Sequence, residues 1–133
     1  MKSEGRVVVA VLTYRRPEEL TGLLPELAAQ VDAVSDRGIE IIVVDNDPEA
    51  SARAAVDGFA GGGVRYVNEP APGIAHGRNR ALTEAGDAKL LVFIDDDERP
   101  RPGWLAALLD TYERTGAAGV TGPVYPDYEG EPD

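Results

Sequence analysis

The sequence predicts an α/β fold built on a mostly parallel sheet with helices on both faces. Apolar runs rich in β-branched residues alternate along the chain with segments whose apolar residues recur at helical spacing. The first run, Val7–Leu12, has no polar interruption, which is typical of a strand buried on both faces of a parallel sheet. At 133 residues the chain has the size of one domain, so we expect residues 1–133 to share one hydrophobic core.

The later elements follow from the same two patterns and from their stop signals. Further strands are expected at residues 39–44, 64–67, 89–94 and 117–124, and helices at 17–34, 49–59, 75–85 and from 102 onward. Pro17 favours the first turn of its helix, whereas Pro25 is expected to kink or split that helix. Gly86 is expected to end the third helix. The polar segment 125–133 has no periodicity and is expected to be extended or frayed.

Distinctive polar clusters follow the predicted strands. Thr13–Arg16 come after the first strand, Asp45–Asp47 after the second, Asn68–Glu69 after the third and Asp95–Asp97 after the fourth. Strands that alternate with helices form a parallel sheet, and such sheets bind ligands beyond the carboxyl ends of their strands. The four clusters are therefore expected together at one edge of the sheet.

Composition limits the ligands and partners of the chain. The 13 Lys and Arg residues against 24 Asp and Glu residues give a net charge of −11, which argues against binding to nucleic acid or anionic lipid. An anionic ligand would need local cations, a bound metal or backbone N–H groups. No cysteine is present, so disulfides and thiolate metal sites are excluded. The apolar runs are too short for a membrane span and the first five residues form no apolar signal core, so a soluble, cytoplasmic protein is expected.

The acidic triplet Asp95–Asp97 is the strongest candidate for chemistry. Three adjacent carboxylates after a buried strand repel one another unless a cation or hydrogen bonds compensate. With oxygen ligands only, Mg²⁺ or Mn²⁺ fits better than Zn²⁺, and these ions commonly bridge carboxylates to substrate phosphates. The alternative interpretation is a solvated acidic turn.

Two other clusters have both a binding and a structural interpretation. Asp45 and its neighbours can accept hydrogen bonds from a nucleobase or ribose, or they can cap the next helix. The segment Gly73–Asn79 places Arg78, His76 and backbone N–H groups where an anion could be bound, although it is not a dinucleotide-binding fingerprint. His76 alone is more typical of a surface or capping residue, and Arg78 could equally face solvent.

Taken together, four segments in this order resemble the family two glycosyltransferases of GT-A fold, which is Rossmann-like. The matching segments are Val9–Pro17, Val43–Asp47, Gly73–Leu82, and Phe93–Glu98 followed by Pro102 and Trp104–Leu105. The order and spacing match across nearly the whole chain.

The resemblance implies a nucleotide-diphospho-sugar donor, either a UDP-, GDP- or dTDP-sugar. The donor site would comprise Thr13, Tyr14, Arg15, Asp45, Asp47, Arg78, Asp95 and Asp96. The triplet would be the DxD motif of the family, with Asp97 as the first choice for the ligand of a Mn²⁺ or Mg²⁺ ion and Asp95 as the second. That ion would neutralise charge on the leaving nucleoside diphosphate.

The family reaction is a displacement at the anomeric carbon by an acceptor hydroxyl, usually with inversion, and it needs a carboxylate general base. The resemblance places this base downstream of the DxD motif, in the acceptor-binding half. Since Val120–Pro126 resembles the crossing into that half and the chain stops at Asp133, we expect a truncated donor domain without a catalytic base. Glu98, Glu129 and Glu131 are not good substitutes for it. The surface normally covered by the missing half would favour a homodimer.

Four alternatives stand beside this interpretation. A sugar-phosphate nucleotidyltransferase would carry a glycine-rich signature after the first strand, and Thr13–Arg16 lack those glycines. A phosphatase of the haloacid dehalogenase type would have Thr or Val where Glu98 stands. A signalling receiver would have an acidic pair after the first strand. A nucleotide-binding module without turnover remains the non-catalytic alternative.

Overall fold

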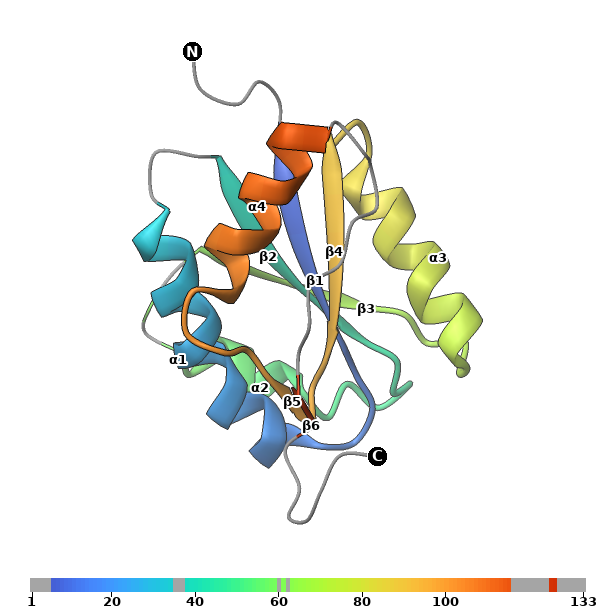
Figure 1. Ribbon diagram of the computed structural model, residues 1–133. Helices are drawn as coiled ribbons and strands as arrows, with labels where there is room; N and C mark the ends of the chain where they lie inside the picture. Colours follow the sequence, from blue (N-terminus) through green and yellow to red (C-terminus); the bar gives the residue numbers. More distant parts are fainter. Residues whose placement is uncertain (1–5, 35–37, 60, 62, 116–124, 127–133) are drawn as a thin grey trace.

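The computed structural model describes residues 6–34, 38–59, 61, 63–115 and 125–126, and it has the predicted α/β fold. The strand predicted at 117–124 lies outside the described residues. The elements are β1 (Val7–Thr13), α1 (Pro17–Ala33), β2 (Ile39–Asp45), α2 (Arg53–Asp57), β3 (Val64–Asn68), α3 (Ile74–Ala85), β4 (Leu90–Asp95), β5 (Glu98–Arg99), α4 (Trp104–Thr115) and β6 (Tyr125–Pro126). Figure 1 shows how the helices surround the sheet.

The main sheet has four parallel strands in the order β3-β2-β1-β4, which confirms the predicted parallel topology. In the register, Thr13 pairs with Asp45 and Leu12 with Asp95, while Asp45 also pairs with Asn68. The carboxyl ends of the four strands are therefore level, and the polar residues that follow them start from one edge. This edge lies at the lower end of β1 and β4 in Figure 1.

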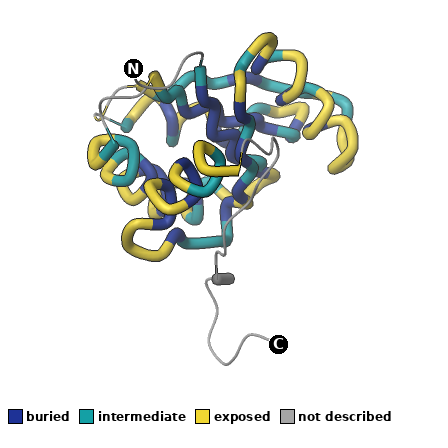
Figure 2. The backbone as a smooth tube through the Cα atoms, turned by 45° about the horizontal axis from the view of Figure 1, so that its top comes forward, coloured by how far each residue is buried: buried dark blue, intermediate teal, exposed yellow. Residues whose placement is uncertain are grey.

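Helices cover both faces of the sheet, as the unbroken apolar run of β1 predicts. Alternate β1 residues, among them Val9 and Val11, belong to the larger core on one face, which α1, α2 and α4 complete. Val8 and Ala10 belong to the smaller core on the other face, where α3 contributes Ala81. Figure 2 shows the buried segments gathered in the central strands and on the inner sides of the helices.

The helix α1 runs through Pro25, so the predicted split does not occur. A proline removes one backbone hydrogen bond and disfavours the preceding turn. Here the leucines on both sides of Pro25, including Leu24 and Leu27, are buried against the sheet while Pro25 itself is exposed. Burying a leucine side chain stabilises by about 1.5–3 kcal/mol, and the helix buries four of them, so packing outweighs the lost bond.

The two-residue strands β5 and β6 pair antiparallel, and sequence patterns did not predict β5. Arg99 of β5 reaches α1, where its guanidinium lies 3.2 Å from Glu19 Oε1. A side chain at Gly22 would begin only 3.0 Å from that guanidinium, so the glycine makes room for the contact. This contact fixes the segment directly after the acidic triplet. Of the predicted extended tail, only residues 125–126 are described, and they are extended.

One helix is shorter in the structure than predicted, and another ends where predicted. The helix predicted at 49–59 is shortened to α2, because the residues before it form hydrogen-bonded turns. The helix α3 ends as predicted at Gly86, and the φ of 59° of this glycine lies in the left-handed region that glycine adopts readily.

In the part of the chain that the structure describes, no helix has the length and apolarity needed to cross a membrane.

Candidate functional site

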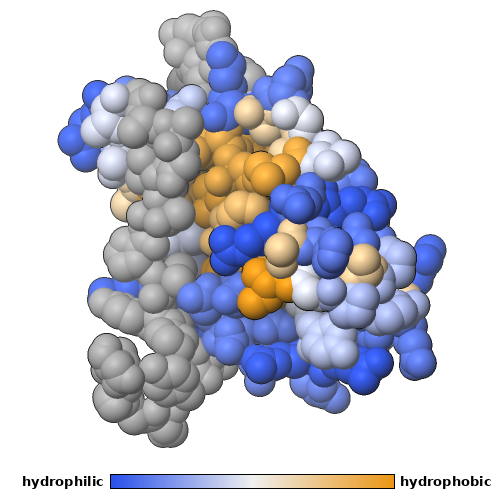
Figure 3. Space-filling view, turned by 90° about the vertical axis from the view of Figure 1, so that its right-hand side faces the viewer, coloured by the Kyte–Doolittle hydropathy of each residue, from blue (hydrophilic) through white to orange (hydrophobic). Residues whose placement is uncertain are grey.

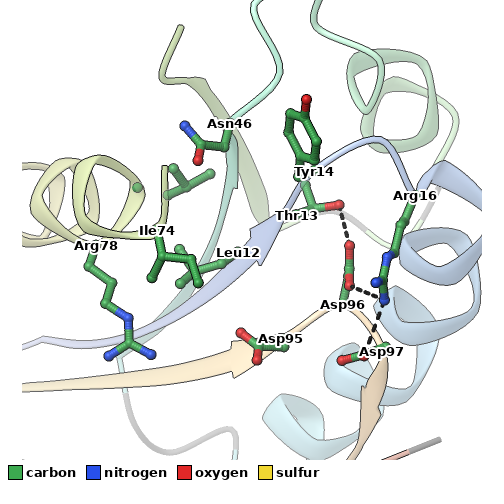
Figure 4. A pocket seen from close by; sticks show the side chains of 12 residues that line it. Leu12, Thr13, Tyr14, Arg16, Asn46, Ile74, Arg78, Asp95, Asp96 and Asp97 are labelled. Carbon is green, nitrogen blue, oxygen red and sulfur yellow. Dashed lines mark hydrogen bonds and ion pairs between the residues drawn. The ribbon is translucent and has the colours of Figure 1, made fainter. Parts of the chain in front are cut away.

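A pocket of about 260 Å³ lies at the carboxyl edge of the sheet. It is lined by Leu12, Thr13, Tyr14, Arg16, Val44, Asn46, Ile74, Gly77, Arg78, Asp95, Asp96 and Asp97. Figure 4 shows the acidic triplet and Arg16 on one side and residues of α3 on the other. The pocket therefore joins a charged rim to an apolar wall.

The structure brings six of the predicted site residues to this pocket and leaves three outside its lining. Those in the lining are Thr13, Tyr14, Arg78, Asp95, Asp96 and Asp97. Those outside it are Arg15, Asp45 and Asp47. The lining also includes Arg16 and Asn46, which were noted in their clusters but not assigned to the site.

Asp96, the middle residue of the triplet, points away from its neighbours toward β1. Its Oδ2 accepts a hydrogen bond of 2.7 Å from Thr13 Oγ1, and its Oδ1 lies 3.7 Å from Arg16 Nη1. Burial raises the pKa of the Asp96 carboxyl, and the hydrogen bond from Thr13 opposes that rise. Since Asp96 is only 5% exposed and both oxygens have partners, its evident role is to hold the triplet against β1.

Asp95 and Asp97 present their carboxylates to the pocket (Figure 4). Burial raises the pKa of Asp95, and the negative charge of Asp97 raises it further. The Asp95 backbone N–H donates a 2.9 Å hydrogen bond to Glu98 Oε1, which fixes the turn but leaves the Asp95 carboxylate to the pocket. The crowding of negative charge predicted from the sequence is therefore present at these two residues.

Asp45 lies under the loop that follows β2, outside the pocket lining. It is fully buried, and its Oδ1 accepts a hydrogen bond from the backbone N–H of Asp47 at 3.2 Å. Its Oδ2 accepts one from the backbone N–H of Ala52 at 3.0 Å and one from the hydroxyl of Tyr66 at 2.7 Å. Both carboxylate oxygens thus serve the structure of this chain.

Arg15 and Asp47 form a second internal contact beside the pocket. Arg15 Nε lies 3.3 Å from Asp47 Oδ1, and the Arg15 guanidinium lies 5.1 Å from the centre of the Tyr14 ring. The pKa of Asp47 is lowered, chiefly by the backbone N–H of Glu49 and also by Arg15. Arg15 has a φ of 57°, which is uncommon for a residue with a side chain. Arg15 thus pairs with Asp47, whereas its neighbour Arg16 lines the pocket.

Asn46 connects the end of β2 to the loop that leads into α3. Its Nδ2 donates to the carbonyl oxygens of Glu69 at 3.1 Å and Ala71 at 2.8 Å. Its Oδ1 accepts a hydrogen bond of 2.9 Å from the backbone N–H of Gly73, the residue before α3. Asn46 thereby fixes the first turn of α3, which supplies Ile74 and Arg78 to the pocket. An asparagine directly after a buried strand was the sequence signal for this role.

Arg78 supplies positive charge on the α3 side of the pocket. Its guanidinium lies 5.2 Å from the centre of the Phe93 ring of β4, a cation–π contact that holds it near the sheet. Its charge lowers the pKa of Asp95, opposing the larger effects of burial and of Asp97. His76, on the same helix, is exposed and does not line the pocket.

Comparison with known proteins assigns the chain to a family. The model described as "Glycosyl transferase family 2" matches residues 8–133. The chain belongs to glycosyl transferase family 2. This membership favours the glycosyltransferase interpretation over the nucleotidyltransferase, phosphatase and receiver interpretations.

Two curated relatives and one solved structure resemble this family 2 chain. The succinoglycan biosynthesis protein ExoM of Rhizobium meliloti (strain 1021) is 44% identical over 125 residues, which cover 90% of this chain and 39% of the relative. The glucosyl-dolichyl phosphate glucuronosyltransferase of Haloferax volcanii is 32% identical over 124 residues, which cover 92% of this chain and 38% of the relative. The chain thus spans about two fifths of the length of these relatives.

The solved structure is the mannosyltransferase PcManGT from Pyrobaculum calidifontis, in complex with GDP-Man and Mn²⁺. It has a TM-score of 0.68 and 25% sequence identity, and the match covers 83% of this chain and 33% of that chain. This similarity supports the predicted GT-A, Rossmann-like fold.

The pocket offers carboxylate oxygens for the divalent metal that this family implies. Among the described residues, no group of three or more His, Asp or Glu side chains is placed to enclose a metal ion. The pocket does hold the carboxylates of Asp95 and Asp97, and the negative charge of Asp97 raises the pKa of Asp95. Mg²⁺ and Mn²⁺ prefer oxygen ligands, and Mg²⁺ is typically held by one or two carboxylates together with substrate phosphates. The residues therefore fit an open metal site that a phosphate-bearing ligand completes.

Proposed function

We propose that this chain is the donor-binding part of a glycosyltransferase that transfers a sugar from a nucleotide-diphospho-sugar to an acceptor hydroxyl in a metal-dependent reaction. The pocket carries this proposal, because it combines two carboxylates suited to a divalent cation with arginines on either side. Its position at the carboxyl edge of a parallel sheet is where such folds bind ligands. Family membership and the complex of the solved relative with GDP-Man and Mn²⁺ support the same proposal.

The proposed ligand is anionic although the chain carries a net charge of −11. A diphosphate approaching this pocket would meet Arg16 and Arg78, and it would also meet the N-terminal turn of α3, whose backbone N–H groups favour anions. The local positive groups therefore offset the unfavourable overall field at the place where the diphosphate would lie.

The side chains would divide the work in the following way. Asp95 and Asp97 would hold the divalent cation, and Arg78 would bind the diphosphate. Thr13 and Tyr14, at the end of β1, would contact the nucleoside, and Thr13 also keeps Asp96 in place through its 2.7 Å hydrogen bond. When bound, the cation would neutralise charge on the leaving nucleoside diphosphate.

Three residues that the sequence assigned to nucleotide binding have partners within the chain instead. Arg15, Asp45 and Asp47 were expected to contact the nucleotide, and in the structure their side chains bind one another or neighbouring backbone. We propose that they shape the loop beside the pocket. No catalytic base is assigned, and a base contributed by residues beyond this chain stays a prediction.

The proposed homodimer would use the apolar area on the α3 side of the molecule. Figure 3 shows apolar surface on this face of the molecule. Among the described residues, Leu91 and Phe93 of β4 are half-buried and pack against the smaller core, on the α3 side of the sheet. Leu82 of α3 is 56% exposed and Ile74 is 72% exposed. Exposed apolar side chains of this kind favour association where they gather in a patch.

Isothermal titration with UDP, GDP and dTDP, each with and without Mn²⁺, tests the proposed function. We expect one nucleotide to bind only when Mn²⁺ is present, and we expect Asp97→Ala to abolish that binding. Asp110→Ala is the matched control, because Asp110 is an exposed aspartate of α4 that pairs with Arg114 at 3.0 Å. Equal affinity with and without Mn²⁺, or equal affinity of Asp97→Ala and the wild type, would contradict the proposed metal site.

A further inference from the structure

Arg16 occupies a distinctive place between the first strand and the acidic triplet. It is the residue before α1, where its carbonyl oxygen accepts the backbone N–H of Leu20 at 3.1 Å and Pro17 follows at the first helical position. The backbone of Arg16 is therefore held by the start of the helix. Its side chain is 52% exposed and crosses to the turn after β4. The arginine thus combines a backbone held by the helix with a charged end that is accessible to solvent.

The guanidinium of Arg16 contacts two of the three carboxylates (Figure 4). Its Nη1 lies 3.1 Å from Asp97 Oδ2, where it donates a hydrogen bond, and 3.7 Å from Asp96 Oδ1. Asp96 is buried and tied to Thr13, whereas the Asp97 side chain is 47% exposed. Of the two, Asp97 is the carboxylate that can exchange one cationic partner for another.

A divalent cation at Asp97 would compete with this guanidinium. The guanidinium and the divalent cation would both bind the Asp97 carboxylate, and two positive charges so close together repel each other. Binding of a divalent cation at Asp97 would therefore be an exchange of ions.

We propose that Arg16 is a built-in counter-ion of the triplet, which a divalent cation displaces from Asp97 and which the diphosphate of the nucleotide then captures. This inference rests on the proposed function. Arg16 lines the pocket, so its displaced guanidinium stays at the rim where the diphosphate would enter. A guanidinium binds phosphate oxygens in a planar, bidentate arrangement that suits this second position.

The exchange couples the two ligands. Metal alone binds weakly because it must break the Arg16–Asp97 pair without any new partner for the arginine. With nucleotide present the arginine gains such a partner, so metal and nucleotide each raise the affinity of the other by the same factor. Arg16 is a positioning residue in this scheme, and its effect is on binding before any chemical step.

The test measures the dissociation constant of Mn²⁺ from the electron paramagnetic resonance signal of free Mn²⁺, with and without saturating nucleotide. The nucleotide used is the one among UDP, GDP and dTDP that binds with Mn²⁺. The variants are Arg16→Gln, which removes the charge, and Arg16→Lys, which keeps the charge without the planar fork. Arg114→Gln is the control, since Arg114 forms an exposed pair with Asp110 at 3.0 Å on α4.

We expect Arg16→Gln to bind Mn²⁺ alone about three- to fivefold more tightly, the upper part of the range that release of an exposed ion pair supplies. The factor by which nucleotide strengthens Mn²⁺ binding should fall at least as much. The Mn²⁺ affinity of Arg16→Lys should lie between those of the wild type and Arg16→Gln, and that of Arg114→Gln should match the wild type. A merely structural loss at Arg16 would loosen the site and weaken Mn²⁺ binding, so a gain of affinity separates the two explanations.

Two results overturn the inference in distinguishable ways. If the wild type binds Mn²⁺ with nucleotide but Arg16→Gln binds Mn²⁺ alone no more tightly, the counter-ion role is wrong and the proposed function stands. If Mn²⁺ binds to none of the proteins, with or without nucleotide, the proposed metal site is wrong and the inference fails with it. If circular dichroism shows that Arg16→Gln does not fold, Arg16→Lys decides by the same criterion, because it too must bind Mn²⁺ alone more tightly than the wild type.

Discussion

Replacing Tyr66 with phenylalanine should destabilise the chain without changing its affinity for nucleotide. The Tyr66 hydroxyl donates a 2.7 Å hydrogen bond to Oδ2 of the fully buried Asp45. Burial raises the pKa of Tyr66, and the bond to Asp45 raises it further, so the hydroxyl stays protonated and remains a donor. Phenylalanine removes this donor with little change of shape, leaving the backbone N–H groups of Asp47 and Ala52 as the partners of Asp45.

The expected cost follows from the charge of the acceptor. A hydrogen bond to a charged group contributes roughly 1.5–3 kcal/mol, so we expect Tyr66→Phe to lower the free energy of unfolding by about 2 kcal/mol. With an unfolding entropy of about 2 cal/mol/K per residue, a chain of this length should unfold at a temperature about 7 °C lower. The loop beside the pocket keeps its other bonds, so nucleotide affinity should not change.

Urea unfolding followed by circular dichroism measures the stability, and titration with nucleotide and Mn²⁺ measures the affinity. Asp45→Asn, alone and combined with Tyr66→Phe, completes a double-mutant cycle that isolates the contact between the two side chains. The reasoning is refuted if Tyr66→Phe costs less than about 0.5 kcal/mol, the level of an unremarkable surface substitution. It is also refuted if the cost is the same in the Asp45→Asn background, or if Tyr66→Phe alters nucleotide affinity in the folded protein.

Three further outcomes are expected. Thr13→Val removes the hydrogen bond to buried Asp96, so it should cost about 2 kcal/mol in urea unfolding and weaken Mn²⁺ binding in the presence of nucleotide. Glu84→Gln should cost about 1 kcal/mol at pH 7, because Glu84 pairs with two arginines. These arginines lower the pKa of Glu84. Its contribution to stability is therefore complete above the ordinary carboxyl pKa of about 4.3 and is lost as the pH falls below that value. The difference in free energy of unfolding between the wild type and Glu84→Gln should accordingly be smaller at about pH 3.5 than at pH 7. Leu82→Glu should shift a dimer to monomer in size-exclusion chromatography with light scattering, and a wild type that is monomeric at high concentration would contradict the homodimer.

The fold was predictable where one local pattern had a single structural solution. The run Val7–Leu12 has no polar residue, so it requires cover on both faces, and the structure supplies that cover. At Pro25 the local rule allowed a kinked or a split helix, and the helix does not split, because burial of leucines on both sides of the proline depends on the sheet. The pairing of β5 with β6 joins residues far apart in the sequence and has no local signal.

The site was predictable in its place but not in the division of labour among its residues. A parallel sheet dictates that Asp95–Asp97 lie at the carboxyl edge, whatever their orientation. Which carboxylate faces the pocket depends on a partner 83 residues away, since Thr13 binds Asp96 and leaves the other two free of that bond. The neighbouring Arg15 and Arg16 look alike in the sequence, yet Arg15, with its φ of 57°, pairs with Asp47, whereas Arg16 pairs with Asp97 of the triplet.

The order of strands has a consequence for the way the pocket is assembled during folding. β1 is synthesised first, but its pairing with β4 places Val7 opposite Leu90. One edge of β1 therefore stays unpaired until most of the chain has been synthesised. Such distant pairings form slowly, and segments nearer the N-terminus emerge first during synthesis. Thr13 therefore meets Asp96 only when β4 docks, and intermediates that contain only β1, β2 and β3 lack the acidic half of the pocket. A nucleotide that binds only the completed sheet would draw the folding equilibrium forward at its final step.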